Sequence, residues 1–543
     1  MNLKIRFVAL ITLMTLLPLC STAQEELVNV RRGDCTPGIN DNENEDGNGP
    51  RRASRRLPAI RTNWDPNKTY KQMVVLFEFS DSTFQREDAN ATYNRIFNEP
   101  HYNESAGPGS VADYFRVQSD GLLNLSFDIY GPVQVDQKAQ KFDAPTIDTR
   151  YYGADMMAIA LKKVLDANPD VDYSQYDWDG DKTIEQVIFV YAGPGGNKNS
   201  DKSYGHIWPN TSTMSQQTTP GGYRISNYTC SAELWLAGNK DLRSCGIGTI
   251  CHEFSHSLGL PDIYPVGNNW TGSVADEWDL MDGGNFTNYG WCPPNYSPLE
   301  KMLLGWLQPV ELTEAFSAKD MPSAADSRLV YQVKHTDNEY LLIENRQWKG
   351  WDLGLPGKGI VIWHVNYDAS DWKNNRVNST TNQPRYSLVA ADNMNYDDWI
   401  AKAKAMGITM QNKLYRNSPR LNSILLSGSV YPFIPTEETE KTNNEFTDSS
   451  TPAAEMFTNN SSGSKLLGKP LTNIAITEDG LASFDFMGGA TGIESIMDQF
   501  YFLSSQSVYD LSGRRVLKPV EGQLVIVRGA DGIVRKVRYG REK

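Results

Sequence analysis

The sequence of 543 residues predicts an α/β (α+β) region followed by all-β sandwich structure. Up to about residue 320, buried strand patterns such as Met73–Phe79 alternate with amphipathic helix patterns such as "GADMMAIALKKVLDA". From about residue 325, most patterned segments are short strands separated by turn residues, among them "EYLLIENRQ" and "GKGIVIWHVNYD". We therefore expect the mixed region to span residues 66–322 and a β-sandwich domain to span residues 323–488.

The composition argues against two classes of protein. Hydrophobic residues make up 39% of the chain and charged residues 22%, which is typical of a folded chain and not of a disordered one. The net charge of −14 argues against nucleic-acid binding, because phosphate recognition requires a clustered basic surface. We therefore expect a folded protein with no nucleic-acid partner.

Residues 1–23 have the pattern of a secretory signal peptide. Lys4 and Arg6 precede a short apolar run, and the small residues "STA" suit cleavage after Ala23. Lipoprotein processing at Cys20 is the alternative, although Leu19 is not the small residue that usually precedes such a cysteine. No other apolar stretch approaches spanning length, so we expect no transmembrane span and a secreted or cell-surface protein.

Residues 24–65 are expected to form a pro-segment or linker. The stretch "GINDNENEDGNGPRRASRRLPA" is first acidic and then basic, with many turn formers and almost no apolar residues. Such a composition cannot build a core and is easily cut by proteases. The pairs Arg51-Arg52 and Arg55-Arg56 are candidate cleavage points, or simply a solvated basic patch.

The stretch "CHEFSHSLGLPDIY" carries the most specific chemical pattern of the chain. Residues 247–258 are expected to be helical, and His252 and His256 then lie one turn apart on the same face. Glu253 stands beside them, which completes the HExxH pattern of a zinc site with an adjacent general base. Two structural histidines on a buried helix are the alternative interpretation.

A third zinc ligand is expected shortly after this helix. Gly259 can adopt a positive φ, end the helix and reverse the chain, which would bring Asp262 back toward the two imidazoles. Glu277 is the alternative third ligand, as in zinc sites where a second helix supplies a glutamate. Met281, in the Gly-rich turn "WDLMDGGN", is a candidate hydrophobic floor beneath the metal, and together with Gly-x-x-Asp it indicates a metzincin-like arrangement.

These motifs resemble the immune inhibitor A family of secreted metallopeptidases. The resemblance rests on "GIGTICHEFSHSLGLPDIY", "WDLMDGGN" and "YSPLEKMLLGWLQP", and weaker motifs extend it from about residue 70 to 370. It implies a metallopeptidase catalytic domain over residues 66–322 that cleaves extracellular proteins or peptides. It also implies zinc ligation by His252, His256 and Asp262, with Glu253 as the catalytic residue and Met281 as the Met-turn.

Two further sites are hypotheses. "YDWDGDKTIE" places Asp177, Asp179, Asp181 and Glu185 in one turn, which suits calcium but is also compatible with a solvated acidic turn. The thiolate of Cys35 could occupy a zinc coordination position and keep a precursor (zymogen) latent, although a leader cysteine without function is the simpler alternative. The remaining cysteines could form disulfides or be buried thiols; they are Cys230, Cys245, Cys251 and Cys292.

The end of the chain resembles the C-terminal sorting domain of the type IX secretion system. Residues 489–497 are expected to be a linker, and residues 498–543 carry "VYDLSGRRV" and "LVIVRGADGIVRKV". The segment "EGQLVIV" departs from the commoner pattern of that domain, and an ordinary extra sandwich domain is the alternative. The resemblance implies export through the periplasm and contact with secretion machinery.

Together these patterns predict a secreted zinc endopeptidase that hydrolyses peptide bonds through a water activated by Glu253. Two other functions remain open at this stage. One is a non-catalytic, zinc-stabilised extracellular binding or adhesion protein. The other is a zinc amidase acting on another class of substrate.

Overall fold

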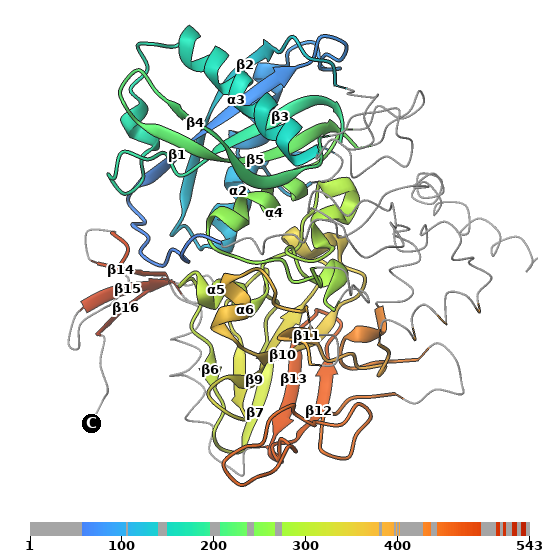
Figure 1. Ribbon diagram of the computed structural model, residues 1–543. Helices are drawn as coiled ribbons and strands as arrows, with labels where there is room; N and C mark the ends of the chain where they lie inside the picture. Colours follow the sequence, from blue (N-terminus) through green and yellow to red (C-terminus); the bar gives the residue numbers. More distant parts are fainter. Residues whose placement is uncertain are drawn as a thin grey trace, which may run out of the picture.

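The computed structural model describes most residues from Leu57 onward (Figure 1). The described residues are 57–104, 107–139, 149–195, 207–235, 244–266, 274–379, 383–395, 398, 401, 405, 427–435, 442–489, 507–510, 514–516, 524–528 and 534–538. The predicted signal peptide, the pro-segment up to residue 56 with Cys35, and the linker after Gly489 lie outside the described residues.

The first region is built on a five-stranded sheet with the order β2-β1-β3-β5-β4. Four strands are parallel, and β4 runs antiparallel to β5 at one edge. The strand predicted at Met73–Phe79 is β1. The strands are β1 (Thr69–Glu78), β2 (Asn124–Gln134), β3 (Val187–Pro194), β4 (Asn210–Thr218) and β5 (Arg224–Leu234).

Helices cover both faces of this sheet, and the alternation of side chains along β1 explains why. Val74 and Leu76 face the helices α1 (Ala89–Asn98), α2 (Val111–Gln118) and α4 (Gly248–Ser257) in one hydrophobic cluster. Met73, Val75 and Phe77 face α3 (Thr149–Ala167) in a second cluster. A strand buried on both faces in this way reads as a continuous apolar run, as β1 does.

The second region contains two mainly antiparallel sheets, with the orders β11-β10-β9-β8-β6 and β12-β13-β7. Their strands begin before the expected boundary between residues 322 and 323, because β6 and β7 belong to them. The strands are β6 (Val310–Glu311), β7 (Phe316–Met321), β8 (Tyr331–Lys334), β9 (Glu339–Arg346), β10 (Gly359–Asn366), β11 (Tyr386–Leu388), β12 (Leu471–Ile476) and β13 (Ala482–Phe486).

The larger of these two sheets contributes to two cores. Ile360 and Ile362 of β10 belong to the same hydrophobic cluster as Phe484 of the smaller sheet, as expected for a sandwich-like pairing of sheets. Val361 and Trp363, on the other face of β10, belong to the same hydrophobic cluster as α4 of the first region. The two regions therefore share one core around α4, which lies between them in Figure 1.

The remaining elements are short. The helices α5 (Pro298–Leu303) and α6 (Ala369–Lys373) lie close to the junction of the two regions. Short 3₁₀ segments include Asp276–Trp278 and the kinked Gly284–Gly290. A fourth sheet, which is antiparallel, has the order β14-β15-β16, with strands Ser507–Tyr509, Leu524–Arg528 and Val534–Arg538. Within the described ranges no helix has the length and apolar character needed to cross a membrane.

Candidate metal centre

Helix α4 carries the HExxH pattern, and its start is fixed by a close backbone contact. A Cβ atom on Gly248 would lie 2.1 Å from the carbonyl oxygen of Asn285, so only glycine fits at this position. The helix covers Gly248–Ser257, within the range expected from the sequence, and all of its residues except Ser257 are buried.

The helix ends as predicted from Gly259. This glycine has a φ of +97°, its N–H donates to the carbonyl oxygen of His256 over 3.1 Å, and the N–H of Leu260 donates to that of Ser255 over 3.2 Å. These two bonds define a Schellman motif, which reverses the chain after a helix. The reversal brings Asp262 back to the face of α4 that carries the histidines.

His252, His256 and Asp262 form a compact group. Their candidate ligand atoms all lie within 4.8 Å of one another. Oδ1 of Asp262 is 3.2 Å from Nε2 of His252 and 3.3 Å from Nε2 of His256. The three side chains are buried, with exposed fractions of 0%, 4% and 2%. The alternative ligand Glu277, also buried, is not part of this group.

The hydrogen bonds of the two imidazoles show that a cation fits this group. Nδ1 of His252 lies 2.8 Å from the carbonyl oxygen of Leu280, and Nδ1 of His256 lies 2.8 Å from that of Leu260. A carbonyl oxygen only accepts hydrogen bonds, so each Nδ1 must carry a proton. When such a ring is neutral, its Nε2 has no proton, and this Nε2 lone pair faces Asp262. Three lone-pair donors then converge, which is the donor set of a zinc site.

The charge of Asp262 is consistent with this arrangement. Burial alone would raise the pKa of its carboxyl, but protonated rings at His256 and His252 hold that pKa well below its usual range, a role that a bound cation takes over when the rings are neutral. The carboxylate is therefore the form present at neutral pH. Its second oxygen, Oδ2, accepts a hydrogen bond of 2.7 Å from Nδ2 of Asn375.

Glu253 is next to His252 in the sequence, and only one of its two carboxylate oxygens has a hydrogen-bond partner among the described residues. Its Oε2 atom is 2.9 Å from Oγ1 of Thr211 on the edge strand β4, and both residues are buried. Its Oε1 atom is also buried but has no hydrogen-bond partner among the described residues. A buried carboxylate oxygen without a partner is costly and rare, so this atom is suited to bind water or substrate.

Met281 is fully buried in the core around α4. Its carbonyl oxygen accepts a hydrogen bond of 2.8 Å from the N–H of Ile263, the residue after Asp262. The preceding residue, Leu280, contacts His252 as described above. The turn around Met281 therefore supports two segments of the candidate site through backbone groups.

Sequence reasoning missed Thr211 and Asn375. Neither belongs to a motif, and each contacts the site across a long separation, 42 residues for Thr211 and 113 for Asn375. Their positions depend on the packing of β4 and of the second region, which no local pattern encodes.

The acidic turn has a different environment from the one expected. Asp177, Asp179 and Asp181 form a second group of candidate ligands, which does not include Glu185. Glu185 instead pairs with the guanidinium of Arg61 at 2.9 Å, and burial raises its pKa to about 7. The aspartates accept hydrogen bonds from backbone N–H groups of their own turn. Calcium at this turn stays a prediction.

Three of the predicted thiols are free and buried; they are Cys230, Cys251 and Cys292. Disulfide pairing of these three is therefore wrong, and the alternative of buried thiols holds. Burial raises the pKa of each thiol, so they stay protonated and unreactive at neutral pH.

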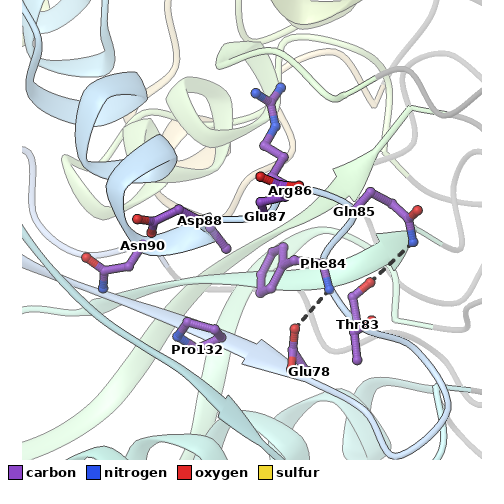
Figure 2. Close-up of a pocket in the computed structure, with 10 residues that line it drawn as sticks. Glu78, Thr83, Phe84, Gln85, Arg86, Glu87, Asp88, Asn90 and Pro132 are labelled. Atoms are coloured by element: carbon purple, nitrogen blue, oxygen red, sulfur yellow. Dashed lines mark hydrogen bonds between the residues drawn. The ribbon is translucent and has the colours of Figure 1, made fainter.

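A surface pocket of about 420 Å³ lies away from this group (Figure 2). It is lined mainly by the loop between β1 and α1, including Phe84 and Arg86, and by Pro132 of β2. Glu78 lines it too and accepts a hydrogen bond of 3.0 Å from the N–H of Phe84. None of the predicted site residues lines this pocket.

Comparison with known proteins points to the same segment of the chain. Residues 61–304 match the family described as immune inhibitor A peptidase M6, catalytic domain. Immune inhibitor A of Bacillus thuringiensis subsp. alesti is 24% identical over 276 residues, which cover 42% of this chain and 39% of that protein. The pre-pro-metalloprotease PrtV of Vibrio cholerae serotype O1 (strain M66-2) is 21% identical over 268 residues, or 44% of this chain and 28% of PrtV.

This chain thus spans less than half the length of the curated relatives that it matches. The match of residues 61–304 to the peptidase M6 (immune inhibitor A) catalytic domain and the similarity to these relatives both support a metallopeptidase function for this segment.

Proposed function

We propose that this protein is a secreted zinc endopeptidase that hydrolyses peptide bonds of extracellular proteins or peptides. The observation that carries the proposal is the convergence of Nε2 of His252, Nε2 of His256 and Oδ1 of Asp262 beside Glu253. This group lies inside the segment that matches a peptidase catalytic domain.

In this proposal the residues have distinct roles. His252, His256 and Asp262 hold zinc, which as a Lewis acid lowers the pKa of water to about 7 and polarises a carbonyl group. Glu253 takes a proton from the attacking water and later delivers it to the leaving nitrogen. Its Oε1 atom has no partner among the described residues and is free for this exchange, while Thr211 holds Oε2.

Met281 is proposed as the floor of the site. Its side chain is buried in the core around α4, and its carbonyl oxygen accepts a hydrogen bond from the N–H of Ile263. Leu280, next to it, fixes the ring of His252 through its own carbonyl oxygen. These bonds support a rigid base for two of the three ligands.

Export is proposed from the sequence of the two ends. Residues 1–23 would act as a signal peptide, and residues 498–543 would act as the sorting domain that engages the type IX secretion machinery. The strands β14, β15 and β16 support a small folded unit in this tail. If the proposal is correct, a chain without residues 498–543 accumulates in the periplasm; normal release into the medium would refute it.

The central experiment incubates the purified full chain with an unfolded protein substrate. We expect hydrolysis that stops on addition of a zinc chelator and returns when zinc is restored. The variant Glu253→Gln should retain one zinc ion per chain but lose roughly 10²-fold or more of its hydrolysis rate, because it has no general base.

Each outcome separates the proposal from another function. A zinc-binding protein without hydrolysis of any peptide bond would indicate the non-catalytic alternative. Hydrolysis of a small amide but not of proteins would indicate the amidase alternative. Hydrolysis that persists in Glu253→Gln would rule out the proposed role of this residue.

A further inference from the structure

The segment that carries the third candidate ligand is held by two asparagines of the second region. Asn375 contacts Asp262, and Asn378 contacts the next residue, Ile263. Both asparagines follow helix α6 and lie beyond residues 61–304, the part that matches a peptidase domain. The candidate metal centre is therefore completed from outside that part of the chain.

The side-chain amide of Asn375 forms a paired contact with Asp262. Its Oδ1 accepts a hydrogen bond of 2.6 Å from the backbone N–H of Asp262, and its Nδ2 donates one of 2.7 Å to Oδ2 of the carboxylate. The backbone N–H can only donate and the carboxylate can only accept. The amide of Asn375 must therefore turn its oxygen to the N–H and its nitrogen to the carboxylate. Both residues are buried, which strengthens the two bonds.

This contact gives the two carboxylate oxygens different roles. Oδ2 is occupied by the amide of Asn375. Oδ1 is the atom that lies 3.2 Å and 3.3 Å from the Nε2 atoms of His252 and His256. Rotation of the carboxylate would break the bond to Asn375, and approach to a cation through both oxygens would make Oδ2 share its lone pairs between the amide and the cation.

The backbone around Asn375 holds the amide in place. Asp368 caps the start of α6 through bonds to the N–H groups of Ser370 and Asp371, and Trp372 anchors the helix in the core around α4. The N–H of Asn375 donates to the carbonyl oxygen of Trp372 over 3.2 Å. Asn375 itself has a φ of +52°, a left-handed conformation that asparagine tolerates better than most residues.

We propose that Asn375 is a positioning residue for the metal site: its amide directs Asp262 to coordinate zinc through Oδ1 alone. This inference rests on the proposed function, because it takes Asp262 as a zinc ligand. Partners of this kind fix the orientation of a ligand, and their loss weakens metal binding.

Asn378 provides a matched control. Its Nδ2 donates to the carbonyl oxygens of Ile263 at 2.7 Å and of Tyr386 at 2.8 Å, and its Oδ1 accepts from the N–H of Arg385 at 2.7 Å. It thus ties the same ligand segment to the second region, but none of its hydrogen bonds reaches the carboxylate of Asp262. A substitution at Asn378 therefore weakens the anchoring of the ligand segment but leaves the bond between the Asn375 amide and the Asp262 carboxylate in place.

The test compares Asn375→Gly with Asn378→Ala in the full chain. Glycine is used at residue 375 because it accepts a positive φ without strain. Zinc affinity is measured by competition with a chromophoric chelator, and stability by thermal unfolding of the metal-free proteins. We expect Asn375→Gly to bind zinc roughly 10- to 100-fold more weakly, and Asn378→Ala to lose stability while its zinc Kd changes by less than about threefold.

A second readout reports the coordination itself. In Asn375→Gly the freed Oδ2 can also bind, so the visible absorption of the Co²⁺-substituted variant should be weaker, as expected for a higher coordination number. Unchanged zinc affinity and an unchanged Co²⁺ spectrum in Asn375→Gly would overturn the inference. An equal loss of affinity in Asn378→Ala would overturn it as well, since anchoring alone would then explain the effect. Absence of zinc binding by the unaltered chain would instead overturn the proposed function, and this inference with it.

Discussion

The hydroxyl of Thr211 lies within hydrogen-bond distance of both the carboxylate and the backbone carbonyl of Glu253. The distances from its Oγ1 are 2.9 Å to Oε2 and 2.6 Å to the carbonyl oxygen. The edge strand β4 is thereby joined to helix α4 at the residue proposed as the general base. The single hydroxyl proton of Thr211 is therefore shared between the backbone of the helix and the carboxylate of Glu253.

Thr211→Val should reduce catalysis without removing zinc. Valine keeps the shape of threonine but cannot donate, so Glu253 loses the bond that orients it. We expect kcat to fall roughly tenfold, equivalent to about 1.4 kcal/mol, because a bond to a charged group has been lost. Zinc content and kcat are measured together. A kcat equal to that of the unaltered protein would show that Thr211 does not orient the base.

Asp262→Ala should abolish zinc retention, whereas Glu277→Gln should not. Asp262 supplies the oxygen that faces both imidazoles, and Glu277 lies outside that group. Metal analysis after gel filtration in the presence of a weak chelator distinguishes the variants. Full zinc content in Asp262→Ala, with loss in Glu277→Gln, would assign the third ligand to Glu277.

Gly259→Ala should destabilise the protein more than Gly180→Ala. Both glycines have a positive φ, +97° and +83°, so alanine is strained at either position by about 1–2 kcal/mol. Only at residue 259 would the new Cβ also meet a neighbour, the Cα of Ile60 at 2.8 Å, whereas nothing lies within 4 Å of it at residue 180. Denaturant unfolding of both variants measures the difference, and equal losses would show that the contact with Ile60 is unimportant.

Glu339 should make the stability of the second region dependent on pH. Burial opposes its ionisation, but bonds from His364 and from Thr458 and Phe457 lower the pKa of this carboxyl from 4.5 to about 2. Because the folded-state pKa lies below the unfolded one, its contribution is fully present above about pH 4.5. It is lost as the pH falls toward 2.

Glu339→Gln is therefore expected to lower the free energy of unfolding by roughly 1–2 kcal/mol at pH 7, after allowance for solvent screening, and by much less near pH 2. Chemical denaturation over this range, monitored by circular dichroism, provides the measurement. Glu455→Gln, at an exposed position, is the control and should show no such trend. A loss of stability that does not change with pH would contradict the assignment.

The three aspartates at residues 177, 179 and 181 give a test of the calcium hypothesis. If calcium binds there, its addition to metal-free protein should raise Tm, and Asp179→Asn should reduce that rise because one carboxylate ligand is lost. Asp179 is suited to this substitution because its side chain is 55% exposed. An unchanged Tm on addition of calcium would leave the turn as a solvated acidic loop.

The sequence predicted those features that depend on local chain geometry. The apolar run in β1 and the spacing of His252 and His256 on α4 follow from strand and helix periodicity. Gly259 was identifiable as a helix end because only a residue that accepts a positive φ reverses the chain there. The sequence position of Glu185 predicts that it joins the acidic turn, but its ion pair with Arg61 links residues that are 124 apart and has no local signal.

The features that the sequence did not predict arise from contacts between distant segments. Val361 and Trp363 belong to a strand pattern that fits a separate sandwich domain equally well. Only the folded chain shows that they belong to the hydrophobic cluster that also contains residues of α4. The roles of Thr211 and Asn375 depend in the same way on where β4 and α6 lie in the folded chain. Neither residue belongs to a sequence motif that would indicate its role.

The shared core around α4 and the bond from Asn375 to Asp262 limit the modularity of this protein. A fragment ending at residue 304 would retain every residue of the HExxHxxGxxD pattern but lose the amide that orients its last member. The same applies to a chimera in which the second region is exchanged for that of a distant relative. A shortened version of the protein that keeps this bond has to include the chain at least as far as Asn375.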